Sequence, residues 1–232
     1  MSELVVSALA GVAFGLALAA PPGPMNAIIA EESVVRGWLS GFSAGLGAMT
    51  ADVLFCALAF LGVVAVVEGA PTLRAGMVTA GGLLMCYFAY GAAREALAGA
   101  GALGADGAAG AADGGSHGFR KTFALSLTNP YQIVFWLTVG VRLLQSEPLD
   151  VFAHVPYAGE MLAGTLVVST GSPALLVGFF AGIALWITAF PATLVAVGRR
   201  VDRFAPAVVW TSALVLAGFG VLFLADGVGT LR

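Results

Sequence analysis

Long apolar runs follow one another along the whole chain and are separated by short polar or small-residue segments. Six of these runs have few or no charges over the roughly 20 residues that a helix needs to cross about 30 Å of hydrocarbon. They cover approximately residues 4–30, 38–67, 73–93, 120–145, 173–198 and 205–225. The pattern predicts an all-α membrane protein with six transmembrane helices, forming a single polytopic membrane domain over residues 1–232.

Composition supports this interpretation and argues against a soluble domain. Of the 232 residues, 59% are hydrophobic and 10% are charged, whereas about a quarter of a soluble domain is charged. The first run could instead be a secretory signal peptide, since Ala17-Leu18-Ala19 resembles a cleavage site. Because the start MSELVV has no Lys or Arg, we interpret this run as a transmembrane helix.

The distribution of basic residues predicts an orientation in the cytoplasmic membrane, because Lys and Arg near span ends favour the cytoplasmic side. The loops after spans one, three and five contain Arg36, Arg94, Arg120, Lys121, Arg199, Arg200 and Arg203. The opposite side contains Arg74, Arg142 and Arg232. We therefore expect both termini to lie outside the cell.

A Gly- and Ala-rich stretch at residues 98–118 predicts a flexible cytoplasmic linker. It separates residues 1–97 from residues 119–232, and each part contains three predicted spans. Because three is odd, the second set enters the membrane from the opposite side, as in an inverted repeat. The related pentapeptides GFSAG at 41–45 and GFFAG at 178–182 support this interpretation. Residues 146–172 are expected to form an external loop.

Two of the predicted spans are interrupted by proline, at Gly23-Pro24 in span one and at Asn129-Pro130 in span four. Proline lacks the N–H that a helix interior needs but suits the first position of a new helix. Each break would expose N–H groups and a positive helix end inside the membrane. At that depth such groups must be covered by protein or by the water in a cavity.

These breaks predict a substrate site formed by Gly23, Pro24, Asn26, Asn129 and Pro130, with the Asn26 amide facing the cavity. Positive helix ends favour an anionic group such as a carboxylate. The alternative is a pair of proline kinks that only shape the packing of the helices. Tryptophans 38, 136, 186 and 210 could be interface anchors or walls of the site.

Asp52 is the one acidic residue well inside a predicted span, about 21 Å along the run that begins at Trp38. An acid at such depth is functional by default. Because burial disfavours the charged carboxylate, we expect Asp52 to exchange a proton or to bind a substrate amine. Alternatively, it only bonds a neighbouring helix.

Glycines near Asp52 are expected to let a neighbouring helix pack closely; they are Gly37, Gly41, Gly45 and Gly47. At the end of span one, Glu31 and Glu32 are expected to be solvated and paired with Arg36.

These residues resemble the LysE/RhtB family of exporters. The resemblance rests on PPGPMN at 21–26, on Gly37, Gly41, Gly47 and Asp52 after it, and on TNPYQIVFW at 128–136. It implies export of amino acids such as lysine, arginine, homoserine or threonine. The GPMN segment is somewhat closer to the family's branch for basic amino acids.

The chain departs from the family pattern at two places. Ala51 occupies a position where the family usually has glycine, and the second half has Ala189 or Phe190 where an acid matching Asp52 would lie. Any proton site should therefore be single.

Three functions remain in view. The first is a proton-coupled exporter of amino acids or related metabolites, which works by rocking one half against the other around a mid-membrane site. A divalent-metal exporter is the second, although a single Asp is a poor ligand set. The third is a thiol-disulfide carrier, which Cys56 and Cys86 serve poorly because both lie in the first half. We expect a transporter and not an enzyme, with no cofactor, metal or nucleic acid; its partners would be a small molecule, protons, lipid and possible further copies of the chain.

Overall fold

The computed structural model describes residues 3–61, 71–98, 114–129, 132, 135–136, 140–144, 148–150, 167–201 and 204–230. Its helices in the first part of the chain are α1 (Glu3–Ala19), α2 (Pro24–Arg36), α3 (Trp38–Phe60) and α5 (Pro71–Ala98). Those that follow are α7 (Gly114–Leu127), α9 (Val141–Leu144), α11 (Pro173–Gly198) and α12 (Phe204–Thr230). The described part of the chain is mainly helical, as the apolar runs predicted, and contains two short strands.

Among the described residues, four helices are long and apolar enough to cross a membrane. They are α3 over Trp38–Phe60, α5 over Ala75–Arg94, α11 over Pro173–Gly198 and α12 over Phe204–Gly227. The pair α1 and α2 meets the same test together, with a bend of 83° between them, so the described residues contain up to five candidate spans. The predicted fourth span, 120–145, is described only in part.

The strands β1 (Pro148–Asp150) and β2 (Val167–Ser169) pair in antiparallel fashion, with Pro148 opposite Ser169. Both lie in the segment 146–172, for which the sequence predicted only a loop. The backbone groups of these two strands find partners across the pair.

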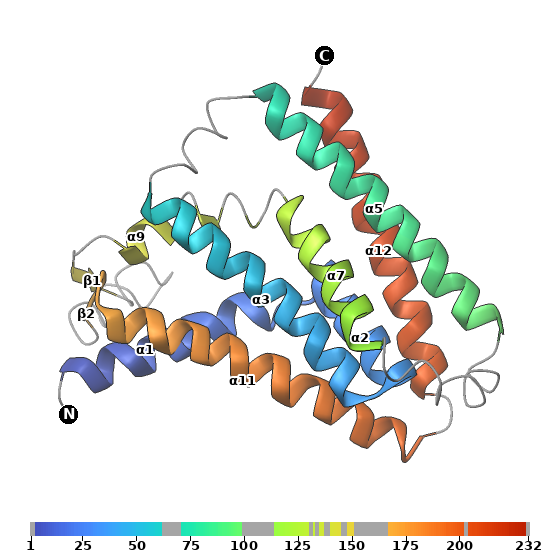
Figure 1. Ribbon diagram of the computed structural model, residues 1–232, viewed down its shortest axis with the longest axis horizontal. Coiled ribbons are helices and arrows are strands. Elements are labelled where there is room, and N and C mark those ends of the chain that lie inside the picture. The colour runs from blue at the N-terminus through green and yellow to red at the C-terminus, as the bar shows by residue number, and fades with distance from the viewer. Residues whose placement is uncertain are drawn as a thin grey trace, which may run out of the picture.

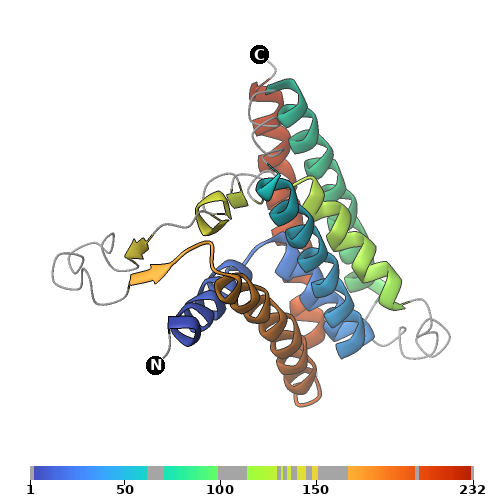
Figure 2. The same ribbon diagram turned by 60° about the vertical axis from the view of Figure 1, so that its left-hand side comes forward.

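The helices pack in three close pairs (Figure 1; Figure 2). Helix α1 lies along α11 and α7 along α3, each pair running in the same direction, whereas α5 and α12 are antiparallel. The short helix α2 lies in the middle and contacts α3, α11 and α12. The α1–α2 bend is therefore surrounded by other helices.

Glycines bring the backbones of α1 and α11 close together. A Cβ at Gly11 or Gly15 would collide with backbone carbonyls of α11, and a Cβ at Gly178 or Gly182 would collide with those of α1. Small residues of this kind allow membrane helices to pack at short range.

The pentapeptides GFSAG and GFFAG do not have equivalent neighbours. A Cβ at Gly41 would meet Ser33 and Pro191, and one at Gly45 would meet the Ile187 side chain, whereas Gly178 and Gly182 face the backbone of α1. The matching letters therefore do not mark matching contacts.

The ends of α5 and α7 make the linker shorter than the predicted range of 98–118. Helix α5 extends to Ala98 and α7 begins at Gly114, so residues 114–118 are helical. Residues 99–113 lie outside the described part of the chain.

Candidate functional site

The break in the first span lies where the prolines predicted it. Helix α1 ends at Ala19, and Pro24 is the first residue of α2, preceded by Gly23 with an extended backbone and no side-chain cap. The first bond of α2 joins the Ala27 N–H to the Gly23 carbonyl at 2.9 Å. The N–H groups of Met25 and Asn26 thus belong to the uncapped first turn of α2, at its positive end.

The side chain of Asn26 forms hydrogen bonds with backbone carbonyls at the break. Its Nδ2 donates to the carbonyl oxygens of Ala19 at 2.7 Å and Pro21 at 2.8 Å, and its Oδ1 accepts from the Trp186 indole at 3.0 Å. The sequence predicted that this amide would face the cavity for substrate. Asn26 lines the cavity described below, and its Nδ2 satisfies carbonyls released by the prolines, which only the folded turn brings within its reach.

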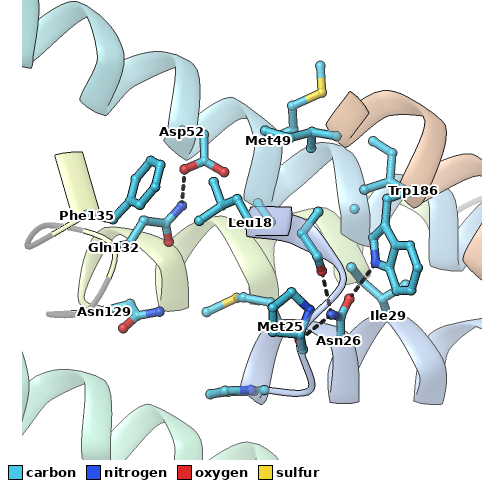
Figure 3. Close-up of a pocket in the computed structure, with 18 residues that line it drawn as sticks. Leu18, Met25, Asn26, Ile29, Met49, Asp52, Asn129, Gln132, Phe135 and Trp186 are labelled. Atoms are coloured by element: carbon cyan, nitrogen blue, oxygen red, sulfur yellow. Dashed lines mark hydrogen bonds between the residues drawn. The ribbon is translucent and has the colours of Figure 1, made fainter. Parts of the chain in front are cut away.

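A cavity of about 230 Å³ opens beside the break. Its lining includes Gly23, Pro24, Asn26, Asn129 and Asp52. The structure thus brings together four of the five residues predicted for the substrate site, and Asp52 with them (Figure 3). The fifth, residue 130, lies outside the described residues.

Asp52 is 6% exposed and lies on the α3 wall of this cavity. Its Oδ1 accepts a hydrogen bond from the Gln132 amide at 2.7 Å and another from the Trp136 indole at 2.9 Å. Figure 3 shows the Gln132 amide pointing at the carboxylate. Among the described residues, both bonds end on Oδ1, so Oδ2 is left for a donor in the cavity.

The indole that bonds Asp52 is itself immobilised by aromatic rings. Trp136 is fully buried, stacks on Phe180 with ring centroids 6.4 Å apart, and meets Phe179 edge-on at 5.8 Å. Aromatic packing of this kind holds a ring in one orientation. The carboxylate is therefore preorganised by a donor that cannot easily turn away.

Sequence reasoning missed Gln132 as a site residue and left the role of Trp136 open. A signal was present, because Asn129, Gln132 and Trp136 follow one another at intervals of three and four residues, the spacing of one helix face. All three positions lie on or beside the cavity.

The second predicted break, at Asn129, also falls at the end of a helix. Helix α7 ends at Leu127, and the Asn129 N–H bonds the Ser126 carbonyl at 3.2 Å. The Asn129 carbonyl then accepts from the Gln132 N–H at 3.2 Å, which starts a new turn. This turn places Gln132 toward Asp52.

Comparison with known proteins identifies the family. The model of the LysE type translocator family matches residues 16–170, which is more than half of the chain. The chain belongs to this family. It is therefore a membrane translocator and not an enzyme.

Two relatives are similar to this translocator over much of their length. One is the Putative amino acid efflux protein YcgF of Bacillus subtilis (strain 168), 27% identical over 68% of this chain and 75% of that protein. The other is the Uncharacterized membrane protein PA4757 of Pseudomonas aeruginosa, 28% identical over 58% of this chain and 61% of that protein. No solved structure matches the chain.

The translocator has a buried ion cluster outside the cavity, where α2, α3 and α7 meet. Glu31 and Glu32 are 1% and 0% exposed. Lys121 Nζ lies 3.3 Å from Glu31 and 3.2 Å from Glu32, Arg36 pairs with Glu32 at 3.1 Å, and the Ser40 hydroxyl donates to Glu32 at 2.7 Å. The expected pairing of this segment with Arg36 is confirmed for Glu32. The expected exposure to solvent is wrong, because α7 covers both carboxylates.

The four glycines predicted for helix packing divide into two kinds. A Cβ at Gly41, Gly45 or Gly47 would collide with neighbouring atoms, and for Gly47 these belong to Phe119 and Thr122 of α7. A Cβ at Gly37 would meet nothing within 4 Å. Gly37 has φ 92° between α2 and α3, so it forms the turn and the packing role predicted for it is wrong.

The described residues contain no group of three or more His, Cys, Asp or Glu side chains that could bind a metal ion. Cys56 and Cys86 are both free thiols in the same part of the chain. Neither observation favours the metal exporter or the thiol-disulfide carrier over translocation of another solute.

Proposed function

We propose that the protein is a secondary active exporter of amino acids or related small metabolites, with the cavity at the α1–α2 break as its substrate site. The observation that carries this proposal is the meeting of the uncapped start of α2 and the Asp52 carboxylate in one cavity. An amino acid presents a carboxylate and an ammonium, which these two features complement. The efflux named for the Bacillus subtilis relative is consistent with this function.

In the proposed complex, the substrate carboxylate lies at the first turn of α2, against the N–H groups of Met25 and Asn26. A helix start attracts anions through its free N–H groups and its dipole. The substrate ammonium donates to Oδ2 of Asp52, and Gln132 and Trp136 keep Oδ1 in place. Asn129 and Pro130 complete the site from the second half.

Asp52 would also couple transport to protons. A proton and a substrate ammonium cannot both occupy the same oxygen, so their binding is mutually exclusive. Exchange of one for the other on opposite sides of the membrane gives proton antiport. Acidic residues inside transmembrane segments serve as proton carriers of this kind.

Alternating access would arise from six spans arranged as two inverted three-helix repeats. Helix pairing supports this arrangement: α1 with α11, α3 with α7, and α5 with α12. An inverted repeat would make α1 equivalent to α7, α3 to α11 and α5 to α12. The pair α1–α11 then corresponds to the pair α7–α3, and the pair α5–α12 corresponds to itself. The parallel and antiparallel directions also agree with an inverted repeat. Six crossings would place both termini on the same side of the plasma membrane, and the basic residues of the loops favour the outer side.

Transport by purified protein in proteoliposomes tests the proposal. We expect vesicles loaded with labelled amino acids to release them faster when a proton gradient is imposed. Asp52→Asn should lower the rate about tenfold to a hundredfold, since it removes a hydrogen bond to a charged group worth ~1.5–3 kcal/mol.

Asp52→Glu is the matched control because it retains the carboxylate, and it should keep part of the rate and its response to the gradient. If Asp52→Asn released substrate at the wild-type rate with the same response to pH, both roles assigned to Asp52 would be wrong.

A further inference from the structure

We infer that the substrate of this cavity is an amino acid of zero net charge with an apolar side chain, such as leucine or methionine. The inference rests on the proposed function and concerns which solute that function serves. Three features of the cavity carry it: its charges, its walls and its volume.

The charge balance of the cavity is complete with one ammonium and one carboxylate. Asp52 is the one charged side chain among the described residues that line it, and the start of α2 supplies the opposite polarity. A second ammonium, as in lysine, would have no anion, and a second carboxylate, as in glutamate, would have no cation. Burying an unpaired charge is strongly unfavourable.

The walls offer few polar groups to a substrate side chain. Both amide hydrogens of Asn26 bond carbonyls of the break, and the Gln132 amide bonds Asp52. The rest of the wall is largely apolar and includes Leu18, Met25, Phe135, Ile183 and Ile187. Apart from Asn129, which also lines the cavity, a hydroxyl or amide on the substrate would find few groups here to replace its bonds to water.

The volume suits one small solute. At about 230 Å³, the cavity is slightly smaller than the pockets of ~300–1,000 Å³ that hold drug-sized ligands. A single amino acid is a solute of this size class. The GPMN resemblance to the branch for basic amino acids points to another class, but Met25 contributes a thioether that gives an ammonium no charge to pair with.

Counterflow into proteoliposomes of the full chain tests the inference. Vesicles loaded with an unlabelled amino acid are placed in the same amino acid in labelled form, in separate assays with L-leucine, L-methionine, L-serine, L-lysine and L-glutamate. We expect leucine or methionine to enter at least about tenfold faster than lysine or glutamate, and faster than serine.

Lysine, glutamate or serine entering as fast as leucine and methionine would overturn the inference and leave the proposed function intact. If none of the five entered faster than into protein-free liposomes, the proposed function would fail, and the inference with it.

A variant that adds a carboxylate to the wall provides a second test. Leu18 lies on the cavity between Asp52 and Asn26 in the view of Figure 3. Leu18→Glu should raise the ratio of lysine to leucine counterflow about tenfold, because it offers an anion to the second ammonium. Leu18→Gln, equal in size but uncharged, should leave the ratio near that of the wild type. An equal ratio in both variants would contradict the charge argument.

Discussion

Replacing Lys121 by methionine removes the cation that lies between the buried carboxylates of Glu31 and Glu32. Lys121 Nζ is within 3.3 Å of both acids, and its own side chain is 13% exposed. Methionine keeps much of the apolar stem and its packing, so the change isolates the charge. The acids remain covered by α7 after the substitution and cannot easily regain water.

The expected loss follows from the burial of the pair. Removing one partner of a buried ion pair costs about 3–5 kcal/mol. Glu32 keeps Arg36 and the Ser40 hydroxyl, which places the loss at the lower end, about 3 kcal/mol. In a chain of this size, a loss of 1 kcal/mol in the free energy of unfolding lowers the melting temperature by ~2–4 °C. The melting midpoint should therefore fall by about 6–12 °C.

Thermal unfolding in detergent, followed by tryptophan fluorescence at one scan rate, measures the effect. Arg120→Met is the matched control, because it removes a cation from the adjacent but exposed position of α7, and its midpoint should change by about 1–2 °C at most. Combining Lys121→Met with Glu31→Gln should recover part of the loss, since one unpaired acid is removed with its partner. If Lys121→Met melted together with Arg120→Met, the cluster would not stabilise the protein through buried charge.

Three further outcomes follow from the site and the helix packing. Asn26→Ala should lower the melting midpoint and the transport rate together, because two carbonyls of the break lose their donor at ~1–3 kcal/mol each; Asn26→Asp, which cannot donate, should resemble it, and a normal midpoint in both would refute the role given to the amide. Trp136→Phe should weaken binding of labelled substrate to purified protein by about threefold to twentyfold, in line with ~0.6–1.7 kcal/mol for a hydrogen bond between membrane helices, and unchanged binding would argue against positioning of Asp52. Gly182→Val should abolish the peak of folded protein in size-exclusion chromatography, because the valine side chain would collide with the α1 backbone. Gly218→Val is the control, since a Cβ there has open space, and it should elute as the wild type. Equal behaviour of the two variants would contradict close packing of α1 and α11.

Several features of the protein were determined locally and could be predicted from the sequence. Mean hydropathy over about 20 residues is a property of one segment, so α3, α5, α11 and α12 were predicted as spans. The missing N–H of proline acts on its own helix, so the start of α2 at Pro24 was predicted as well. Burial of Asp52 followed from its place in an apolar helix.

Other features depended on which segments meet in three dimensions. Gln132 and Trp136 are about 80 residues from Asp52 along the chain. The sequence of α3 alone does not predict that these two residues bond Asp52. Glu31 and Glu32 lie within five residues of Arg36 in sequence and were expected in water, but α7 covers them and supplies Lys121.

The physical reason for the difference is the range of the interactions. Apolar burial in lipid and the loss of a helix bond at proline act within a segment, and both can be evaluated from composition and order alone. A hydrogen bond or ion pair needs two groups within about 3 Å, and packing of helices decides which groups reach that distance. The sequence alone therefore determined a membrane protein with a proline break and a buried acid, whereas the tertiary structure decided which side chains bond that acid, what faces the cavity and which charges are buried.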